Sequence, residues 1–177
     1  MKKIKVLLLA IISTTLLTGC FKRDNMDNIT IYTTTYPIQY LVEQIYGYNS
    51  EVLSIYPAGV EVQNYELTNK QQKDYSQADL FVFNDKSKEK NIAADLLKHN
   101  NNLRIMPIAK NFDEDIEQEA LWLSPSNYLN VAQNIKIELL NLTKSTVLQQ
   151  EITDNYDAIN LTISKYIAEL YLIAENA

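Results

Sequence analysis

Between residues 29 and 142, segments with the hydrophobic pattern of a strand alternate with segments that have the pattern of a helix. Runs of β-branched and apolar residues predict buried strands at 29–34, 51–56, 78–84 and 103–108. Apolar residues at helical spacing predict helices at 37–46, 87–100 and 126–142, and a capped polar segment predicts another at 71–77. Because strands alternate with helices, we expect an α/β fold with a four-stranded, mostly parallel sheet flanked by helices.

The last segment, residues 145–177, predicts one long carboxyl-terminal helix. Its apolar positions alternate steps of three and four, which gives an amphipathic stripe of Ile152, Tyr156, Ile159, Ile163, Tyr166, Leu170 and Ile173. About thirty helical residues span roughly 45 Å, whereas a domain of about 150 residues has a radius of gyration near 15 Å. Either the stripe packs on its own domain, or the helix overhangs it and leaves Tyr166, Leu170, Tyr171 and Ile173 partly exposed. The overhang predicts self-association or docking to another chain.

The first twenty residues have the composition of an export signal. Lys2, Lys3 and Lys5 precede a short apolar run, which predicts a signal peptide at 1–19 rather than a membrane-spanning helix. Residues 17–20, LTGC, resemble the bacterial lipobox, in which the chain is cut before a cysteine that carries a diacylglycerol. The resemblance implies lipid attachment at Cys20, a lipidated tether at 20–28, and a location on the extracytoplasmic face of the cell membrane. The alternative is an ordinary signal peptide followed by an incidental cysteine.

Composition excludes several classes of site and partner. Cys20 is the only cysteine, which excludes a disulfide within the chain and a cysteine-rich metal site. The formal net charge is −6, and without residues 1–19 it becomes −9, from 13 Lys and Arg against 22 Asp and Glu. An acidic chain argues against a nucleic-acid partner. No glycine-rich phosphate loop, Cys–His pair or nucleophile elbow occurs, so we expect no enzyme activity.

The loop at residues 57–68, PAGVEVQNYELT, is the candidate ligand site. It follows the second predicted strand, where Pro57 and Gly59 break the extended chain. Open α/β sheets bind ligands at the carboxyl ends of their parallel strands, which is where this loop lies. It contains neither His nor Cys, and its ligand candidates are Glu61, Gln63, Asn64 and Glu66.

With these elements assigned, the chain resembles the solute-binding lipoproteins of zinc and manganese ABC importers. Residues 57–68 resemble that family's loop Pro-x-Gly-x-Glu-Pro-His-x-Tyr-Glu-Pro-Thr. Three further segments resemble its opening strand and turn, its third strand, and the end of its Asp-Pro-His-x-Trp-Leu-x-Pro motif: 32–37, 78–84 and 121–125. The resemblance implies an amino-terminal lobe at 29–144, a long helix at 145–177 that would link it to a second lobe, and an ABC permease as partner.

Both histidines that the first lobe of the family gives to its metal are replaced here. Gln63 stands at the first position and Ala120 at the second, with Glu119 beside it as a further ligand candidate. The family's remaining ligands come from a second lobe, which would follow Ala177. Zinc prefers imidazole and thiolate ligands. We therefore expect the zinc or manganese binding that the resemblance implies to be degenerate.

The other metal-ligating side chains have simpler explanations. His99, the only histidine, lies at the predicted end of a helix, where it would interact with the helix dipole. Asp113, Asp115 and Glu117 could coordinate calcium or manganese through oxygen, although alternating acidic residues in a loop are more often solvated.

Three functional hypotheses follow. In the first, the chain is a diverged binding lipoprotein of the metal-importer type, which presents a ligand to an ABC permease. In the second, it is an interaction or scaffold lipoprotein without a transport role. In the third, it is a truncated, inactive copy. Neighbouring permease and ATPase genes would favour the first hypothesis, and a neighbouring reading frame for the second lobe would favour the third or a split protein.

Overall fold

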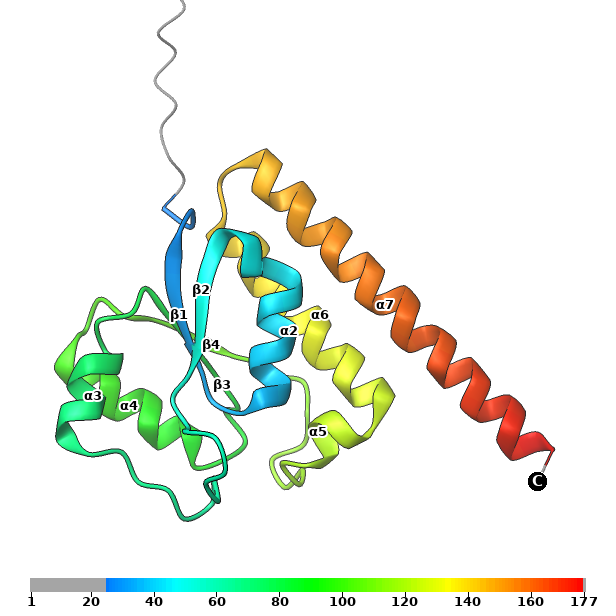
Figure 1. Cartoon of the computed structure of the whole chain (residues 1–177), viewed down its shortest axis with the longest axis horizontal. Helices are drawn as coiled ribbons and strands as arrows, with labels where there is room; N and C mark the ends of the chain where they lie inside the picture. The colour runs from blue at the N-terminus through cyan, green and yellow to red at the C-terminus, as the bar shows by residue number, and fades with distance from the viewer. Residues whose placement is uncertain (1–24, 177) are drawn as a thin grey trace, which may run out of the picture.

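The computed structural model describes residues 25–176, which form a parallel sheet between two groups of helices (Figure 1). In chain order the elements are β1 (Ile29–Thr33), α2 (Tyr36–Tyr46), η1 (Gly47–Asn49), β2 (Ser50–Ser54), α3 (Asn69–Tyr75), β3 (Leu80–Phe83), α4 (Glu89–His99), β4 (Arg104–Pro107), α5 (Ala120–Leu123), α6 (Pro125–Leu142) and α7 (Thr146–Glu175). The four strands pair in the order β2-β1-β3-β4, and every pair is parallel. The predicted fold class is confirmed.

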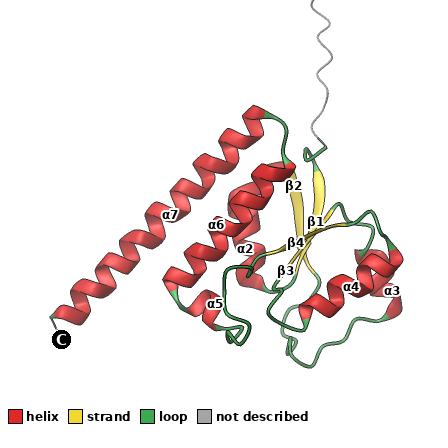
Figure 2. Ribbon diagram, turned by 180° about the vertical axis from the view of Figure 1, so that it is seen from behind, coloured by secondary structure: helices red, strands yellow, loops and turns green. Residues whose placement is uncertain are grey.

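Strand β3 shows how the core is divided between the two faces of the sheet. All four of its side chains are buried, and because side chains alternate along a strand, they enter two different clusters. Leu80 and Val82 belong to a cluster with α2, α6 and α7, whereas Phe81 and Phe83 belong to a cluster with α4. Figure 2 shows the same division, with α2, α6 and α7 on one side of the sheet and α3 and α4 on the other.

Two helix starts have the caps that their sequences favour. Thr68 and Gln71 form a capping box at the start of α3, in which each side chain bonds the backbone N–H of the other residue. At the start of α6, Ser124 Oγ accepts a hydrogen bond from the Asn127 N–H. The short helix α5, which precedes α6, was not expected, because four residues are too few to show a helical period.

Helix α7 packs on the lobe over its first half only. It contacts α6 and α2, and Ile152 and Tyr156 are buried in the core. Farther along, the exposed fractions rise to 61% at Tyr166, 54% at Leu170 and 66% at Ile173. The carboxyl end of α7 extends away from the lobe (Figure 1). The predicted overhang is therefore confirmed, although the self-association predicted from it stays a prediction.

The described end of the predicted tether packs on the lobe. Met26 is 0% exposed and belongs to the core. Its carbonyl oxygen accepts a 2.6 Å hydrogen bond from the Tyr46 hydroxyl, and its sulfur accepts one of 2.8 Å from Arg104 Nη1. The packed lobe therefore begins at least as early as Met26, within the segment 20–28 that was predicted as a tether, while the lipidated tether itself stays a prediction. The predicted signal peptide and Cys20 lie outside the described residues.

Candidate functional site

The strand order places the site at the carboxyl ends of β1 and β3. The chain proceeds from β1 to one neighbour, β2, but β3 and β4 lie on the opposite side of β1. The order therefore reverses between β1 and β3, and ligands bind in the crevice outside such a switch point. Thr34 and Thr35 follow β1, and Asn84 follows β3. Residues 25–28 precede the amino end of β1, so the described start of the chain lies at the other end of this strand from the site.

A pocket of about 590 Å³ opens beside these residues. Its walls come from the turn between β1 and α2, from the chain that follows β2, and from α5. We call it the hydroxyl pocket, and its lining residues are Thr34, Thr35, Tyr36, Pro37, Gln39, Ser54, Tyr56, Pro57, Ala58, Gly59, Val62 and Trp122. Its volume is within the range of small-molecule sites, about 300 to 1,000 Å³.

Three hydroxyl groups in the wall of this pocket lack a hydrogen-bond partner within the protein. They are Thr34 Oγ1, Thr35 Oγ1 and Tyr56 OH, and all three residues are buried. Thr35 occupies the N-cap position of α2, yet its side chain makes no capping hydrogen bond. A buried hydroxyl left without a partner costs about 1 to 3 kcal/mol. The three oxygen atoms are themselves buried beneath the pocket surface, so they contribute to the packing of the wall rather than to its exposed face.

Glu89, at the start of α4, is buried behind this pocket with only neutral donors. It is 1% exposed, and its Oε2 accepts a 2.8 Å hydrogen bond from the Asn84 backbone N–H. Gln118 Nε2 donates to Oε1 at 3.0 Å. The Thr34 hydroxyl also favours the charged form, but without a hydrogen bond of normal geometry.

Electrostatics link Glu89 to the pocket wall. Burial outweighs its hydrogen bonds and raises the pKa of the Glu89 carboxyl to about 7. The pKa of Tyr56 is also raised, first by burial and then by the charge of Glu89.

The predicted ligand loop holds its candidate side chains at the surface. Glu61, Gln63, Asn64 and Glu66 are all exposed. Asn64 Nδ2 donates to Glu61 Oε2 at 2.8 Å, so these two candidates bond to each other. The Gln63 carbonyl oxygen accepts a hydrogen bond from Lys88 Nζ. Glu66 lines a separate pocket, together with Lys88 and other residues.

The loop and the second motif nevertheless meet at one place. Val62, next to Gln63, and Trp122, two residues after Ala120, both line the hydroxyl pocket. Ala120 is the first residue of α5, and its carbonyl oxygen accepts a 2.9 Å hydrogen bond from Asn127 Nδ2. Glu119 is exposed at the N-cap of α5. Residues close in sequence to both of the family's histidine positions therefore line the same pocket, although Gln63 and Ala120 are not among its lining residues.

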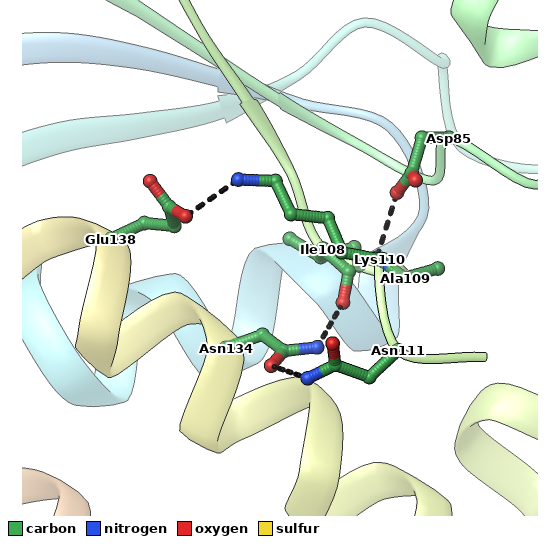
Figure 3. Close-up of polar contacts among 7 residues, drawn as sticks. All are labelled: Asp85, Ile108, Ala109, Lys110, Asn111, Asn134 and Glu138. Carbon is green, nitrogen blue, oxygen red and sulfur yellow. Dashed lines mark hydrogen bonds and ion pairs between the residues drawn. The ribbon is translucent and has the colours of Figure 1, made fainter.

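Polar contacts fix the chain between β4 and this second motif (Figure 3). The Ala109 backbone N–H donates to Asp85 Oδ1 at 2.8 Å, and Asn134 Nδ2 of α6 donates to the Ile108 carbonyl oxygen at 2.8 Å. Lys110 pairs with Glu138 of α6 at 2.7 Å. These contacts hold residues 108–110 against α6 and the end of β3, and so fix where the loop toward α5 begins.

The metal-ligating side chains that the sequence offers lie apart in the described part of the chain. Between residues 25 and 176, no group of three or more His, Cys, Asp and Glu side chains is placed to hold a metal. His99 is exposed at the end of α4, as its sequence position predicts. Asp113, Asp115 and Glu117 are exposed as well, and Glu114 between them pairs with Lys86.

The chain matches one protein family over most of its length. Residues 31–174 match the family described as zinc-uptake complex component A, periplasmic, or ZnuA. The chain belongs to this family. It consists of extracytoplasmic solute-binding proteins of metal ABC importers rather than enzymes, so the predicted family is confirmed. No curated protein matches the chain.

Solved structures of ZnuA-type proteins share the fold. A crystal structure of ZnuA is 22% identical in sequence and has a TM-score of 0.70; the match covers 81% of this chain and 59% of the ZnuA chain. The metal-dependent lipoprotein YcdH from Bacillus subtilis is 22% identical, covers 81% and 55%, and has a TM-score of 0.69. FpvC from Pseudomonas aeruginosa, solved with Mn²⁺, is 19% identical, covers 80% and 54%, and has a TM-score of 0.68. The chain thus spans just over half the length of these ZnuA-type proteins.

Sequence reasoning missed the buried part of the site. The sequence pattern predicted strand residues or strand ends at Thr34, Thr35, Tyr56 and Asn84. It predicted no ligand-binding role for any of the four. Glu89 lies between Lys88 and Lys90, a pattern typical of a solvated helix start. A polar run after a buried strand at a switch point is the one signal that could have found Thr34 and Thr35.

Proposed function

We propose that this chain is a lipid-anchored solute-binding component of a metal-type ABC importer, in which the metal site has degenerated. It presents a solute to an ABC permease on the extracytoplasmic side. The family match supports the transport class, and the residues at the site support the loss of metal binding. The second lobe of the longer relatives, or a partner in its place, would complete the closure around the solute.

Gln63 and Ala120 carry the proposal, since their sequence neighbours Val62 and Trp122 both line the hydroxyl pocket. Gln63 offers a neutral carbonyl oxygen and Ala120 offers no ligand atom, where the family resemblance expects imidazole. The neighbouring carboxylates of Glu61 and Glu119 are exposed to solvent. A zinc site built from these groups would lack the imidazole or thiolate ligands that hold zinc in four-coordinate sites.

Restoring both histidines tests this assignment of the site. The paired change Gln63→His with Ala120→His should tighten zinc binding by about tenfold or more, because it would supply two imidazoles of a four-coordinate zinc site. Each single variant is a matched control and should gain much less, since one histidine cannot chelate the ion. If the pair binds zinc no better than the singles, the two positions do not share a site.

The lipid anchor would hold the lobe with its pocket turned away from the membrane. Residues 25–28 enter the amino end of β1, whereas the lining residues Thr34 and Thr35 follow its carboxyl end. Between residues 25 and 176, no helix has the length and hydropathy required to cross a bilayer. Acyl chains on Cys20 would instead supply attachment, at about 0.8 kcal/mol for each buried methylene.

The overhanging half of α7 supports a second candidate role, that of an interaction lipoprotein. Leu161, Tyr166, Leu170, Tyr171, Leu172 and Ile173 are large apolar residues exposed on this segment. A contiguous exposed apolar surface of this kind is typical of a protein–protein contact rather than of a helix that faces solvent. We infer that α7 pairs with a second copy of the chain or docks on a second lobe.

A further inference from the structure

We propose that the overhanging half of α7 pairs antiparallel with the α7 of a second copy of this chain, about a two-fold axis near Tyr166. The proposal rests on the second candidate role given above and deepens it, because it names the partner of the exposed helix. Three features carry it: an open groove beside α7, the exposed apolar end of the same helix, and two charges of opposite sign on that stretch.

A groove of about 420 Å³ runs between α2 and the middle of α7. Its wall carries four tyrosines, Tyr40, Tyr48, Tyr128 and Tyr166. Tyrosine is enriched in protein–protein interfaces and at the positions that dominate their affinity. Ala158 and Thr162 of α7 also line the groove, two turns and one turn before Tyr166. These small side chains leave room for a second helix to approach α7 on this side.

The apolar end of α7 has the shape and chemistry that this groove would accept. Leu170 and Ile173 are 54% and 66% exposed, and they continue the stripe that places Ile152 and Tyr156 in the core. Positions three and four apart share one face of a helix, so Tyr166 belongs both to this face and to the groove wall. The groove and the apolar end are therefore neighbours along one helix.

A two-fold pairing centred on Tyr166 covers both features at once. In that register Leu170 of each copy lies opposite Thr162 of the other, and Ile173 lies opposite Ile159. Large exposed side chains of one helix thus meet a small and a half-buried one of its neighbour. The same surface serves both copies, which is the usual arrangement of a two-fold symmetric dimer.

The charges on this stretch favour the antiparallel orientation. Between Ala158 and Ala174 the charged residues are Lys165 and Glu169, so the stretch has no net charge, whereas the whole chain carries −6. Neither side chain forms an ion pair within the described residues. Antiparallel pairing about Tyr166 brings each Lys165 near Glu169 of the other copy, whereas parallel pairing would oppose like charges. Two copies of an acidic chain can therefore meet here without repulsion.

The exposed area is sufficient for a specific dimer. The large side chains that line the groove or continue its line are Tyr40, Tyr48, Tyr166, Leu170 and Ile173. At about 200 Å² for a whole large side chain, their exposed fractions amount to roughly 600 Å² in each copy. Two copies would then bury about 1,200 Å², which is where specific protein interfaces begin.

Charge exchange between two copies tests the proposal on the full chain. Sedimentation equilibrium in a density-matched non-ionic detergent should show a dimer of the natural chain with a dissociation constant below about 100 μM. Lys165→Glu and Glu169→Lys each turn both contacts between the copies into repulsions. Each variant alone should therefore dimerise about tenfold more weakly.

An equimolar mixture of these two variants separates pairing between copies from contacts within one helix. In a mixed dimer every acidic side chain again faces a basic one, so the mixture should associate within about twofold of the natural chain. Contacts within one helix cannot be restored by mixing. Glu175→Lys is the matched control, because it makes the same change of charge at an exposed position of α7 outside the paired face, and it should dimerise as the natural chain does.

Two results would overturn the proposal: a natural chain that stays monomeric at high micromolar concentration, or a mixture that associates no more tightly than the single variants. Either would leave the exposed helix to a second lobe or to a different protein. Zinc titration of the same samples keeps this failure apart from that of the proposed function. Submicromolar zinc binding would contradict the degenerate metal site, whereas a monomer that binds no zinc would contradict only the pairing of α7.

Discussion

The buried Glu89 carboxylate accepts a 3.0 Å hydrogen bond from the Gln118 side-chain amide. This contact joins the first residue of α4 to the acidic loop that leads into α5. On its other oxygen, Glu89 accepts the Asn84 N–H at the end of β3. This carboxylate thus links the start of α4, the end of β3 and the loop before α5, all of which lie near the candidate site. Its protonation should therefore influence the stability of the protein.

We predict that Glu89 makes the protein less stable as the pH rises from about 4.5 to about 7. Burial raises the pKa of the folded Glu89 carboxyl to about 7, from an ordinary value of 4.5. Between these values the folded state holds the proton that the unfolded state has lost, so stability falls with increasing pH. The decrease should approach about 3 kcal/mol, because a tenfold change in an equilibrium is worth about 1.4 kcal/mol.

Urea unfolding of the natural chain and of Glu89→Gln, at steps between pH 4.5 and pH 8, isolates this effect. The variant cannot ionise at this position, so the difference in unfolding free energy between the two proteins should change across the window. A difference that is independent of pH would show that Glu89 does not carry the pH dependence.

Hydrophobic periodicity predicted the elements of the fold well, because burial on one or both faces of the sheet determines that pattern. The predicted helix at 145–177 corresponds to α7 (Thr146–Glu175), and the strand at 103–108 to β4 (Arg104–Pro107). The interior of the site was not predictable in this way. Glu89 looks solvated in sequence, and its burial depends on Asn84 and on Gln118, which is 29 residues away. Long-range contacts of this kind leave no periodic signal.

The docking of the amino-terminal segment predicts a loss of stability in Tyr46→Phe. The variant removes the hydroxyl that donates a 2.6 Å hydrogen bond to the Met26 carbonyl oxygen. That buried oxygen then has one hydrogen-bond partner fewer. The unfolding free energy should fall by about 1 to 2 kcal/mol. The matched variant Tyr48→Phe alters an exposed ring and should be neutral. Equal stability of the two variants would contradict the docked arrangement of Met26.

The proposed lipid anchor predicts that Cys20 determines membrane attachment. Cys20→Ser should release the protein to the soluble fraction or leave the precursor uncleaved, because serine cannot form the thioether to diacylglycerol. Fractionation and intact-mass measurement would report both outcomes. A variant with unchanged mass and unchanged membrane attachment would rule out this anchor.

The exposed half of α7 predicts self-association that depends on its apolar face. In the Cys20→Ser background, Tyr166→Glu with Leu170→Glu should convert an associated species to a folded monomer, as measured by sedimentation and circular dichroism. Ser164→Glu with Ala168→Glu is the matched control, because it places two charges at the same spacing on exposed positions of α7. A monomeric parent at high micromolar concentration, together with unfolding of the apolar-face variant, would assign this face to the core instead.

The most direct test of the central claim, a solute-binding protein of the ZnuA family that has lost its metal site, is an anaerobic titration of the full natural chain with zinc and with manganese. A competing chromophoric chelator would measure affinity and stoichiometry in the same experiment. With Gln63 and Ala120 at the positions of the two expected histidines, we predict no submicromolar binding of either metal. One equivalent of zinc or manganese bound with submicromolar affinity would contradict the account.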